Sequence, residues 1–289
     1  MASDTRVVPQ LNDVTIDADW RIAAQAIEAA LLAVGLTKMS GPTQMDLATV
    51  AAPATNAQAT GYHYWQFTDP KQASRPICFR TSYGRWTAAT RFSLKILVAG
   101  GFTAAGATVG WSMTEEQIGP ITGAQAGGPT VTLRTCFTPY GLWLALHNSA
   151  SLTASSYGLW LMRSWGGSDF GDLAHFFCWN GNSSIQATVA DLAKLIAGGR
   201  TGTQSESGSP GSLNAGMPLV GSDASIFPLM CSAGRVEPVP GICFTRTSEV
   251  GAGTFHVDML GATRNYLQSA AFWYAGMTGT APVVGLIWE

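Results

Sequence analysis

Several segments of this chain alternate apolar and polar residues with a period of two. In RFSLKILV at 91–98 the apolar side chains point to one side, and VTLRTCF at 131–137 repeats the pattern. Such alternation is typical of β-strands with one buried face. Further candidate strands, separated by turn-forming Gly, Pro, Asn and Ser clusters, lie at 77–83, 142–147, 159–164, 175–179, 226–231, 242–247, 255–260 and 283–288.

A short repeat predicts how two of these strands pair. The pentapeptide YGLWL occurs at 140–144 and again at 157–161, with a polar connection between the copies. A solenoid needs three or more units, so two copies at this spacing indicate the two arms of one hairpin. Asn180-Gly181 predicts the turn of a second hairpin.

The spacing of apolar residues changes to a helical period at 17–34, DADWRIAAQAIEAALLAV. Asp17 or Asp19 can cap the start, and Gly35 suits the left-handed residue after the end. We expect this helix to lie on the core of its own chain, although its alanine-rich face also allows a seam with another helix. A second, shorter helix is predicted at 189–197, before Gly198-Gly199.

These patterns predict an α+β, β-rich fold, with a sandwich-like or mixed antiparallel β body and two helices. Residues 1–60 form the helix-containing N-terminal segment, and residues 61–289 form the body. Within the body, 198–216 is rich in Gly and Ser and nearly lacks apolar residues, so we expect an exposed, mobile loop.

The chain has few charges for its size. Charged residues make up 12% and hydrophobic residues 46%, whereas soluble domains carry about 25% charged residues. Two classes of protein have so few charges: membrane proteins, and proteins whose surface is largely covered by partner proteins. The longest apolar stretch, 29–36, is far shorter than the roughly 18 residues of a spanning helix, which leaves protein partners.

Charge and the N-terminus exclude other partners and compartments. The net charge is −2, and the 16 Lys and Arg residues are scattered singly, so nucleic-acid binding is not expected. Residues 1–10 lack the basic and apolar regions of a secretory signal, which indicates synthesis in the cytoplasm.

Motifs for common enzyme chemistry are absent from the sequence: there is no Gly-x-Ser-x-Gly, P-loop, His-Glu-x-x-His or Cys-x-x-Cys. We therefore assign no catalytic, cofactor-binding or metal residues and no cofactor. The best candidate is Asp169, Asp172 and His175, which a helix would gather on one face for a metal or a shared proton. Gly171 argues against that helix and favours a polar turn before a strand.

Aromatic residues offer an alternative role. Three tryptophans fall within apolar strand patterns and are expected in the core: Trp143, Trp160 and Trp179. Three isolated histidines are expected either in the core or in an interface: His63, His147 and His256. Tyr62, Tyr64 and Trp65 adjoin a polar stretch and are the candidates for an exposed, glycan-binding patch.

The five cysteines, an odd number, cannot all pair within the chain. We expect most to be reduced core residues, because synthesis occurs in a reducing compartment. The residues are Cys78, Cys136, Cys178, Cys231 and Cys243, of which Cys231 is the candidate for a cross-link between subunits.

One region resembles a group of uncharacterised tailed-bacteriophage virion proteins. The similarity rests on MDLATV at 45–50, YHYWQFTDPKQASRPI at 62–77, Tyr83-Gly84, and the glycine-rich positions 98–101 and 106–107, and spans roughly residues 11–110. The resemblance implies a tail, neck or baseplate component located in the virion and made in the bacterial host cytoplasm. It carries no catalytic residues.

The expected function is accordingly that of a structural virion protein, whose partners are copies of itself and neighbouring virion proteins. A receptor- or glycan-binding tail module is the first alternative, and a cell-envelope hydrolase built around Asp169, Asp172 and His175 is the second.

Overall fold

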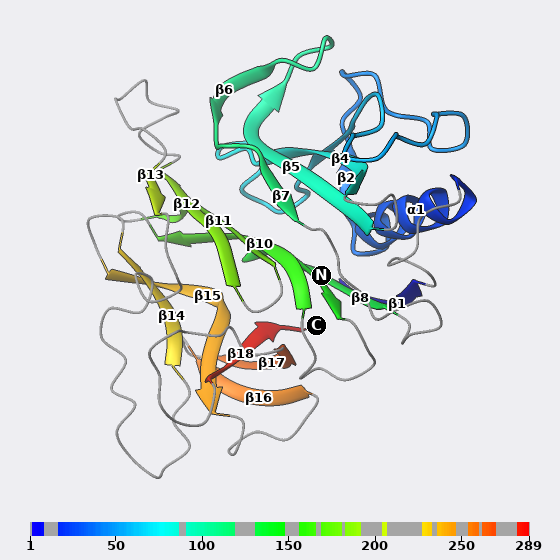
Figure 1. Ribbon diagram of the computed structural model, residues 1–289. Coiled ribbons are helices and arrows are strands. Elements are labelled where there is room, and N and C mark those ends of the chain that lie inside the picture. The colour runs from blue at the N-terminus through cyan, green and yellow to red at the C-terminus, as the bar shows by residue number, and fades with distance from the viewer. Residues whose placement is uncertain are drawn as a thin grey trace.

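Three antiparallel sheets and a helix make up the computed structural model of this protein (Figure 1). The structure describes residues 2–8, 17–86, 91–118, 131–147, 156–165, 169–180, 183–191, 204–206, 227–232, 236–246, 254–259, 262–269 and 282–288. Most of these residues lie in strands. This architecture confirms the predicted β-rich α+β class.

The central sheet has seven strands in the order β1-β8-β9-β10-β11-β12-β13. Its strands are β1 (Ala2–Val8), β8 (Val131–Thr138), β9 (Gly141–His147), β10 (Ser156–Trp165), β11 (Phe170–Asn180), β12 (Ser183–Asp191) and β13 (Gln204–Glu206). Both predicted hairpins are confirmed. Trp143 in β9 lies opposite Trp160 in β10, and Asn180 in β11 lies opposite Ser183 in β12.

The upper sheet, above the central one in Figure 1, has six strands, five of them in the order β2-β3-β4-β5-β6. They are β2 (Thr37–Lys38), β3 (His63–Gln66), β4 (Cys78–Trp86), β5 (Arg91–Phe102) and β6 (Thr108–Ser112), and β7 (Glu116–Ile118) also pairs with β5. The lower sheet has the order β14-β15-β18-β17-β16. Its strands are β14 (Phe227–Ser232), β15 (Val236–Arg246), β16 (Thr254–Met259), β17 (Ala262–Ser269) and β18 (Pro282–Ile287).

The helix α1 (Asp17–Ala33) ends as its sequence predicts. Gly35 has a φ of 95°, in the left-handed region that glycine favours. The Gly35 and Leu36 amides donate to the carbonyls of Leu32 and Leu31, which satisfies the last turn. Trp20, Ile27 and other side chains of one face are buried, so the helix lies on the core of its own chain.

The middle strands of the central sheet, β8, β9 and β10, are buried on both faces. Leu142, Leu144 and Leu146 of β9 join the core formed with α1 and the upper sheet. Trp143, which points the opposite way, donates a hydrogen bond from Nε1 to the Ile287 carbonyl of the lower sheet, 2.6 Å away. Burial on both sides explains why β9 reads as a nearly continuous apolar run rather than an alternating one.

Two sequence predictions need correction. The second helix, predicted at 189–197, is wrong at its start, because residues 189–191 belong to β12 and Val189 pairs with both His175 and Gln204. Sheet pairing on two sides overrides the local helical pattern. Within the predicted loop at 198–216, Gln204–Glu206 forms β13. The other residues of both predictions lie outside the described part of the chain.

Candidate functional site

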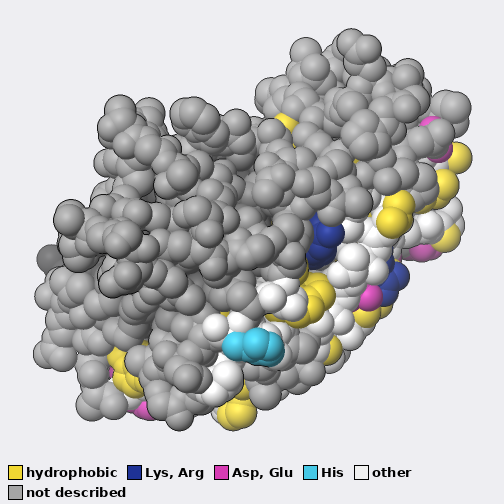
Figure 2. Space-filling model, turned by 90° about the horizontal axis from the view of Figure 1, so that it is seen from below, with side chains coloured by type: hydrophobic (Ala, Val, Ile, Leu, Met, Phe, Trp, Pro, Cys, Tyr) yellow, Lys and Arg dark blue, Asp and Glu magenta, His cyan; other side chains and the backbone are white. Residues whose placement is uncertain are grey.

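The solvent-facing side of α1 is unusually apolar. We call Ala18, Ile22, Gln25, Ala29, Leu32 and Ala33 the outer face of α1, because at 3.6 residues per turn they fall within about 100° of arc. Ile22 and Leu32 are 45% and 47% exposed. Gln25 is the one polar member, and none is charged. Hydrophobic side chains gather along the right-hand edge of Figure 2, the side where Figure 1 places α1 and β1.

The charged residues of α1 flank this outer face and bond within their own chain. Asp17 accepts from Arg85 at 3.0 Å, Arg21 donates to the Leu47 carbonyl at 2.7 Å, and Glu28 pairs with Lys38. These bonds hold the charges against β4, β2 and the loop at Leu47 rather than over the outer face. The outer face therefore presents aliphatic side chains to water with no charge among them.

Strand β1 lies beside α1 at the same end of the molecule (Figure 1). The Arg6 guanidinium reaches the Ala29 carbonyl of the helix at 3.2 Å. Within the described residues β1 pairs on one side only, with β8, so its other edge presents free backbone donors and acceptors. Val7 at this edge is 60% exposed. The outer face of α1 and the unpaired edge of β1 lie at the same end of the described part of the molecule.

The predicted polar trio does not converge. Asp169 pairs with Lys71 at 2.7 Å, and Asp172 pairs with Arg75 at 2.9 Å, both from the loop between β3 and β4. The side chain of His175 points to the opposite face of β11, because the two faces alternate along a strand. The predicted polar turn is therefore wrong for most of this segment, because strand β11 begins at Phe170 and already contains Asp172 and His175.

His175 is buried on its own side of the sheet, where Ser164 Oγ lies 2.5 Å from its Nε2. Burial lowers the pKa of His175 from 6.5 to about 4, so the ring is neutral at physiological pH. No group of three metal-ligating side chains occurs within the described ranges. The trio therefore has no shared geometry for binding a metal or transferring a proton.

The proposed aromatic patch at 62–65 is wrong. Trp65 is fully buried and donates from Nε1 to Thr81 Oγ1 at 3.1 Å, and Tyr64 packs edge-on against Phe102. Only Tyr62 is partly exposed, and the Arg80 guanidinium covers its ring at 4.1 Å. The sequence misjudged these residues because the polar stretch before them folds back over the sheet, with the Met45 amide bonded to the Tyr62 carbonyl.

Several other residues lie in the core, as their sequence surroundings predict. His63 is a buried core histidine, as predicted: Nε2 lies 2.8 Å from the Met45 carbonyl and Nδ1 lies 3.2 Å from the Tyr83 hydroxyl. Trp143 and Trp160 are buried, as expected. Cys78, Cys136 and Cys178 are buried, reduced cysteines. His256 on β16 is exposed, so it does not lie in the core of its own chain. The side chains of His147, Trp179, Cys231 and Cys243 lie outside the described residues.

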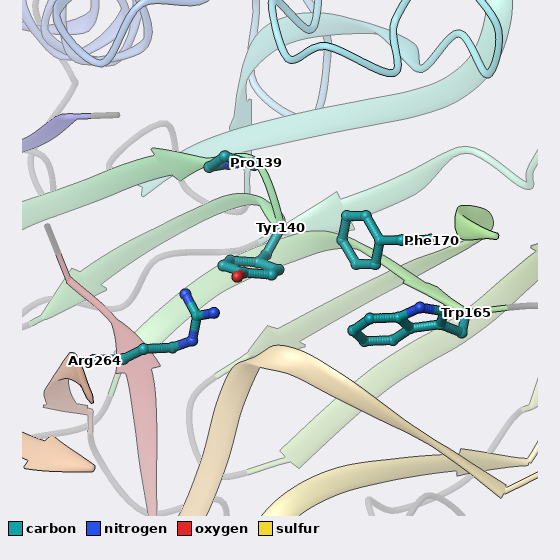
Figure 3. A pocket seen from close by; sticks show the side chains of 5 residues that line it. All are labelled: Pro139, Tyr140, Trp165, Phe170 and Arg264. Atoms are coloured by element: carbon teal, nitrogen blue, oxygen red, sulfur yellow. The ribbon is translucent and has the colours of Figure 1, made fainter. Parts of the chain in front are cut away.

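Partly exposed aromatic residues do gather elsewhere. Tyr140, Trp165 and Phe170 line a pocket with Pro139 and Arg264, between the central and lower sheets (Figure 3). Sequence reasoning missed this pocket, because its residues come from three separate segments. The one local signal is their position beside turns, before Gly141 and Gly166-Gly167.

Comparisons with family models, curated proteins and solved structures find no match to this chain. Among the described residues, no helix is both long and apolar enough to cross a membrane.

Proposed function

We propose that this protein is a structural component of a tailed-phage virion, in the tail, neck or baseplate, and that it works by assembling with copies of itself. The outer face of α1 carries the proposal. A helix that is apolar on both sides is normally buried on both sides. In this chain the inner side is covered by the protein's own core, and the outer side remains for a partner.

The outer face suits a second copy of the same helix. Alanines at 18, 29 and 33 allow two helices to approach closely, within the usual 8–10 Å between axes. Ile22 and Leu32 lie five residues either side of position 27, and Gln25 and Ala29 lie two residues either side. An antiparallel pair with its two-fold axis at position 27 therefore places Ile22 opposite Leu32 and Gln25 opposite Ala29. Such self-complementarity is what a two-fold interface requires.

The low charge of the chain supports the same proposal. Uncovered apolar surface costs free energy in water, about 25 cal/mol for each Å², and assembly removes that cost. The open edge of β1, next to the helix, offers backbone hydrogen bonds to further subunits or neighbouring virion proteins. The resemblance of residues 11–110 to phage virion proteins supports a virion as the assembly in which the copies associate.

Sedimentation of the purified protein tests the interface. Wild-type protein should form dimers or larger oligomers at micromolar concentration, and Ile22→Asp or Leu32→Asp should shift it towards monomer, because each buries a carboxylate in the interface. Val109→Asp is the matched control. Val109 is 48% exposed on β6, away from α1, and its replacement should leave the oligomer intact. A wild-type monomer at high concentration would refute self-assembly.

Cross-linking tests the orientation. Oxidation of a mixture of Ile22→Cys and Leu32→Cys proteins should give a mixed disulfide dimer, because a disulfide needs Cα atoms about 4.4–6.8 Å apart. In a parallel pair each variant would instead cross-link to itself. The virion role is tested separately by whether the reading frame lies among identified tail or neck genes of a phage genome.

A further inference from the structure

A pocket opens where the turn between β8 and β9 meets the lower sheet. Its volume is about 490 Å³, and it is lined by Pro139, Tyr140, Trp165, Phe170 and Arg264 (Figure 3). All five side chains are partly exposed. Phe170 meets Tyr140 and Trp165 edge-on, with ring centroids 5.6 and 4.8 Å apart. The described part of the pocket lining thus combines aromatic walls with one cationic side chain.

The backbone holds these side chains firmly. Trp165 and Phe170 are cross-strand partners at a β-bulge, where the register of β10 and β11 shifts. The Tyr140 carbonyl accepts a hydrogen bond from the Arg163 amide at 2.6 Å, which fixes the turn against β10. Arg264 comes from β17 of the other sheet. Aromatic side chains on strand ends and tight turns form a preorganised surface.

Arg264 has unused hydrogen-bonding capacity. Its guanidinium stacks over the Tyr140 ring at 4.3 Å, and within the described residues it forms no ion pair. Its Nε is buried and has no hydrogen-bond partner there. A buried donor without an acceptor is costly unless a ligand or water supplies one. The rest of the partly exposed guanidinium forms a planar fork that fits a carboxylate, so an acidic group in the pocket would give Arg264 an acceptor.

We propose that this pocket binds a sugar that carries a carboxylate, with the ring against the aromatic walls and the carboxylate at Arg264. The C–H face of a pyranose packs on the electron-rich face of an aromatic ring, while its hydroxyls remain in water at the open side. A bare anion would not use three rings, and a purely apolar ligand would not use the arginine. The volume lies within the usual range for small-molecule sites, about 300–1,000 Å³.

Saturation-transfer NMR with four monosaccharides tests this proposal independently of self-assembly. D-Glucuronate and D-galacturonate should bind, and D-glucose and D-galactose should bind roughly tenfold more weakly or not detectably, because they lack the charge-assisted hydrogen bonds. Arg264→Gln should abolish the preference for the acids. Trp165→Leu should weaken binding of the acids by roughly tenfold, while the oligomer size of both variants stays that of wild type.

Arg80→Gln is the matched control, because Arg80 stacks over Tyr62 at 4.1 Å in a similar cation–π pair outside the pocket. It should leave binding of the acids unchanged. The proposal is overturned if neither acid binds at millimolar concentration, or if the neutral sugars bind as well. It is equally overturned if benzoate binds more tightly than the sugar acids and displaces them from the pocket. The same holds if Arg80→Gln changes binding as much as Arg264→Gln does.

Discussion

The guanidinium Nη2 of Arg163 lies 3.0 Å from Oδ2 of Asp69, and the two side chains are only 0% and 2% exposed. Arg163 belongs to β10 of the central sheet, and Asp69 belongs to the loop between β3 and β4 of the upper sheet. Arg163 also donates to the Arg75 carbonyl of that loop at 2.8 Å. The ion pair and hydrogen bond of one buried arginine therefore link the upper sheet to the central sheet.

Asp69→Ala should destabilise the protein by about 3–5 kcal/mol, because it leaves the Arg163 charge buried without its partner. Urea unfolding at a fixed protein concentration measures this as a lower midpoint. Asp169→Asn is the control, since it removes an ion pair between the same loop and sheet at a site where the Asp169 side chain is 50% exposed. Exposed pairs contribute little. Equal midpoints for the two variants would contradict the linking role of Arg163.

Glu116 should make the protein less stable as the pH rises. Its side chain on β7 is buried, Oε1 has no partner among the described residues, and burial raises its pKa from 4.5 to about 7. The folded state then holds a proton that the unfolded state has lost, so stability falls between pH 4.5 and about 7, by at most about 3 kcal/mol. Glu116→Gln should flatten this fall in urea titrations.

The neighbouring Glu115 provides the control. Glu115 pairs with Arg80 at 3.2 Å, and its side chain is 34% exposed. Glu115→Gln should keep the pH dependence of wild type. If it flattens the curve as much as Glu116→Gln does, the burial of Glu116 is not the cause.

His175 should act in the opposite direction. Burial lowers its pKa from 6.5 to about 4, so below pH 6.5 the unfolded state gains a proton that the folded state does not. Stability is therefore lost as the pH falls from 6.5 to about 4, again by at most about 3 kcal/mol. Between pH 4.5 and 6.5 the effects of Glu116 and His175 oppose each other, so each needs its own variant.

His175→Gln should remove the acid destabilisation measured by urea unfolding, and His256→Gln should not, because His256 is exposed on β16. In the His175→Gln protein, the free energy of unfolding should fall more steeply between pH 4.5 and 6.5 than in wild type, because only the effect of Glu116 remains. A wild-type slope in His175→Gln would show that another group governs acid unfolding.

The sequence predicted those elements whose signal is local. The strand at 91–98 alternates because one face of β5 joins the main core, although Ser93 and Leu97 on its other face are buried too. The YGLWL hairpin follows from two matching apolar arms. Strand β1 was missed because ASDTRVV is mostly polar and pairs with β8, more than 120 residues later in the chain. Only that distant partner makes it a strand, so nothing within the segment could reveal it.

The outer face of α1 and the aromatic pocket were predictable from the sequence to different degrees. The apolar outer face of α1 follows from the spacing of Ile22 and Leu32, although the sequence favoured packing within the chain. The aromatic pocket could not be foreseen, because Tyr140, Trp165 and Arg264 meet only when the lower sheet packs on the central sheet. Tyr62 and Trp65 misled for the same reason: exposure depends on which segment covers a residue, and the covering segment lies elsewhere in the sequence.

Gly141 should tolerate no side chain. It follows Tyr140 in the turn between β8 and β9, its φ is +139°, and a Cβ there would lie 2.2 Å from the Leu161 carbonyl oxygen and 2.7 Å from the Met162 Cα. Both obstacles are backbone atoms of β10, so relief requires the hairpin to move. Gly141→Ala should therefore cost about 3 kcal/mol or more, from backbone strain and overpacking together.

Gly110 separates these two causes. Its φ is +75°, but a Cβ there meets nothing within 4 Å, so Gly110→Ala should cost only the backbone strain, about 1 kcal/mol. Thermal or urea unfolding of both variants gives the comparison. Because Gly141 positions Tyr140, Gly141→Ala should also weaken binding of D-glucuronate, whereas Gly110→Ala should not. Similar losses of stability in the two proteins would mean that the hairpin yields easily and does not hold Tyr140 in place.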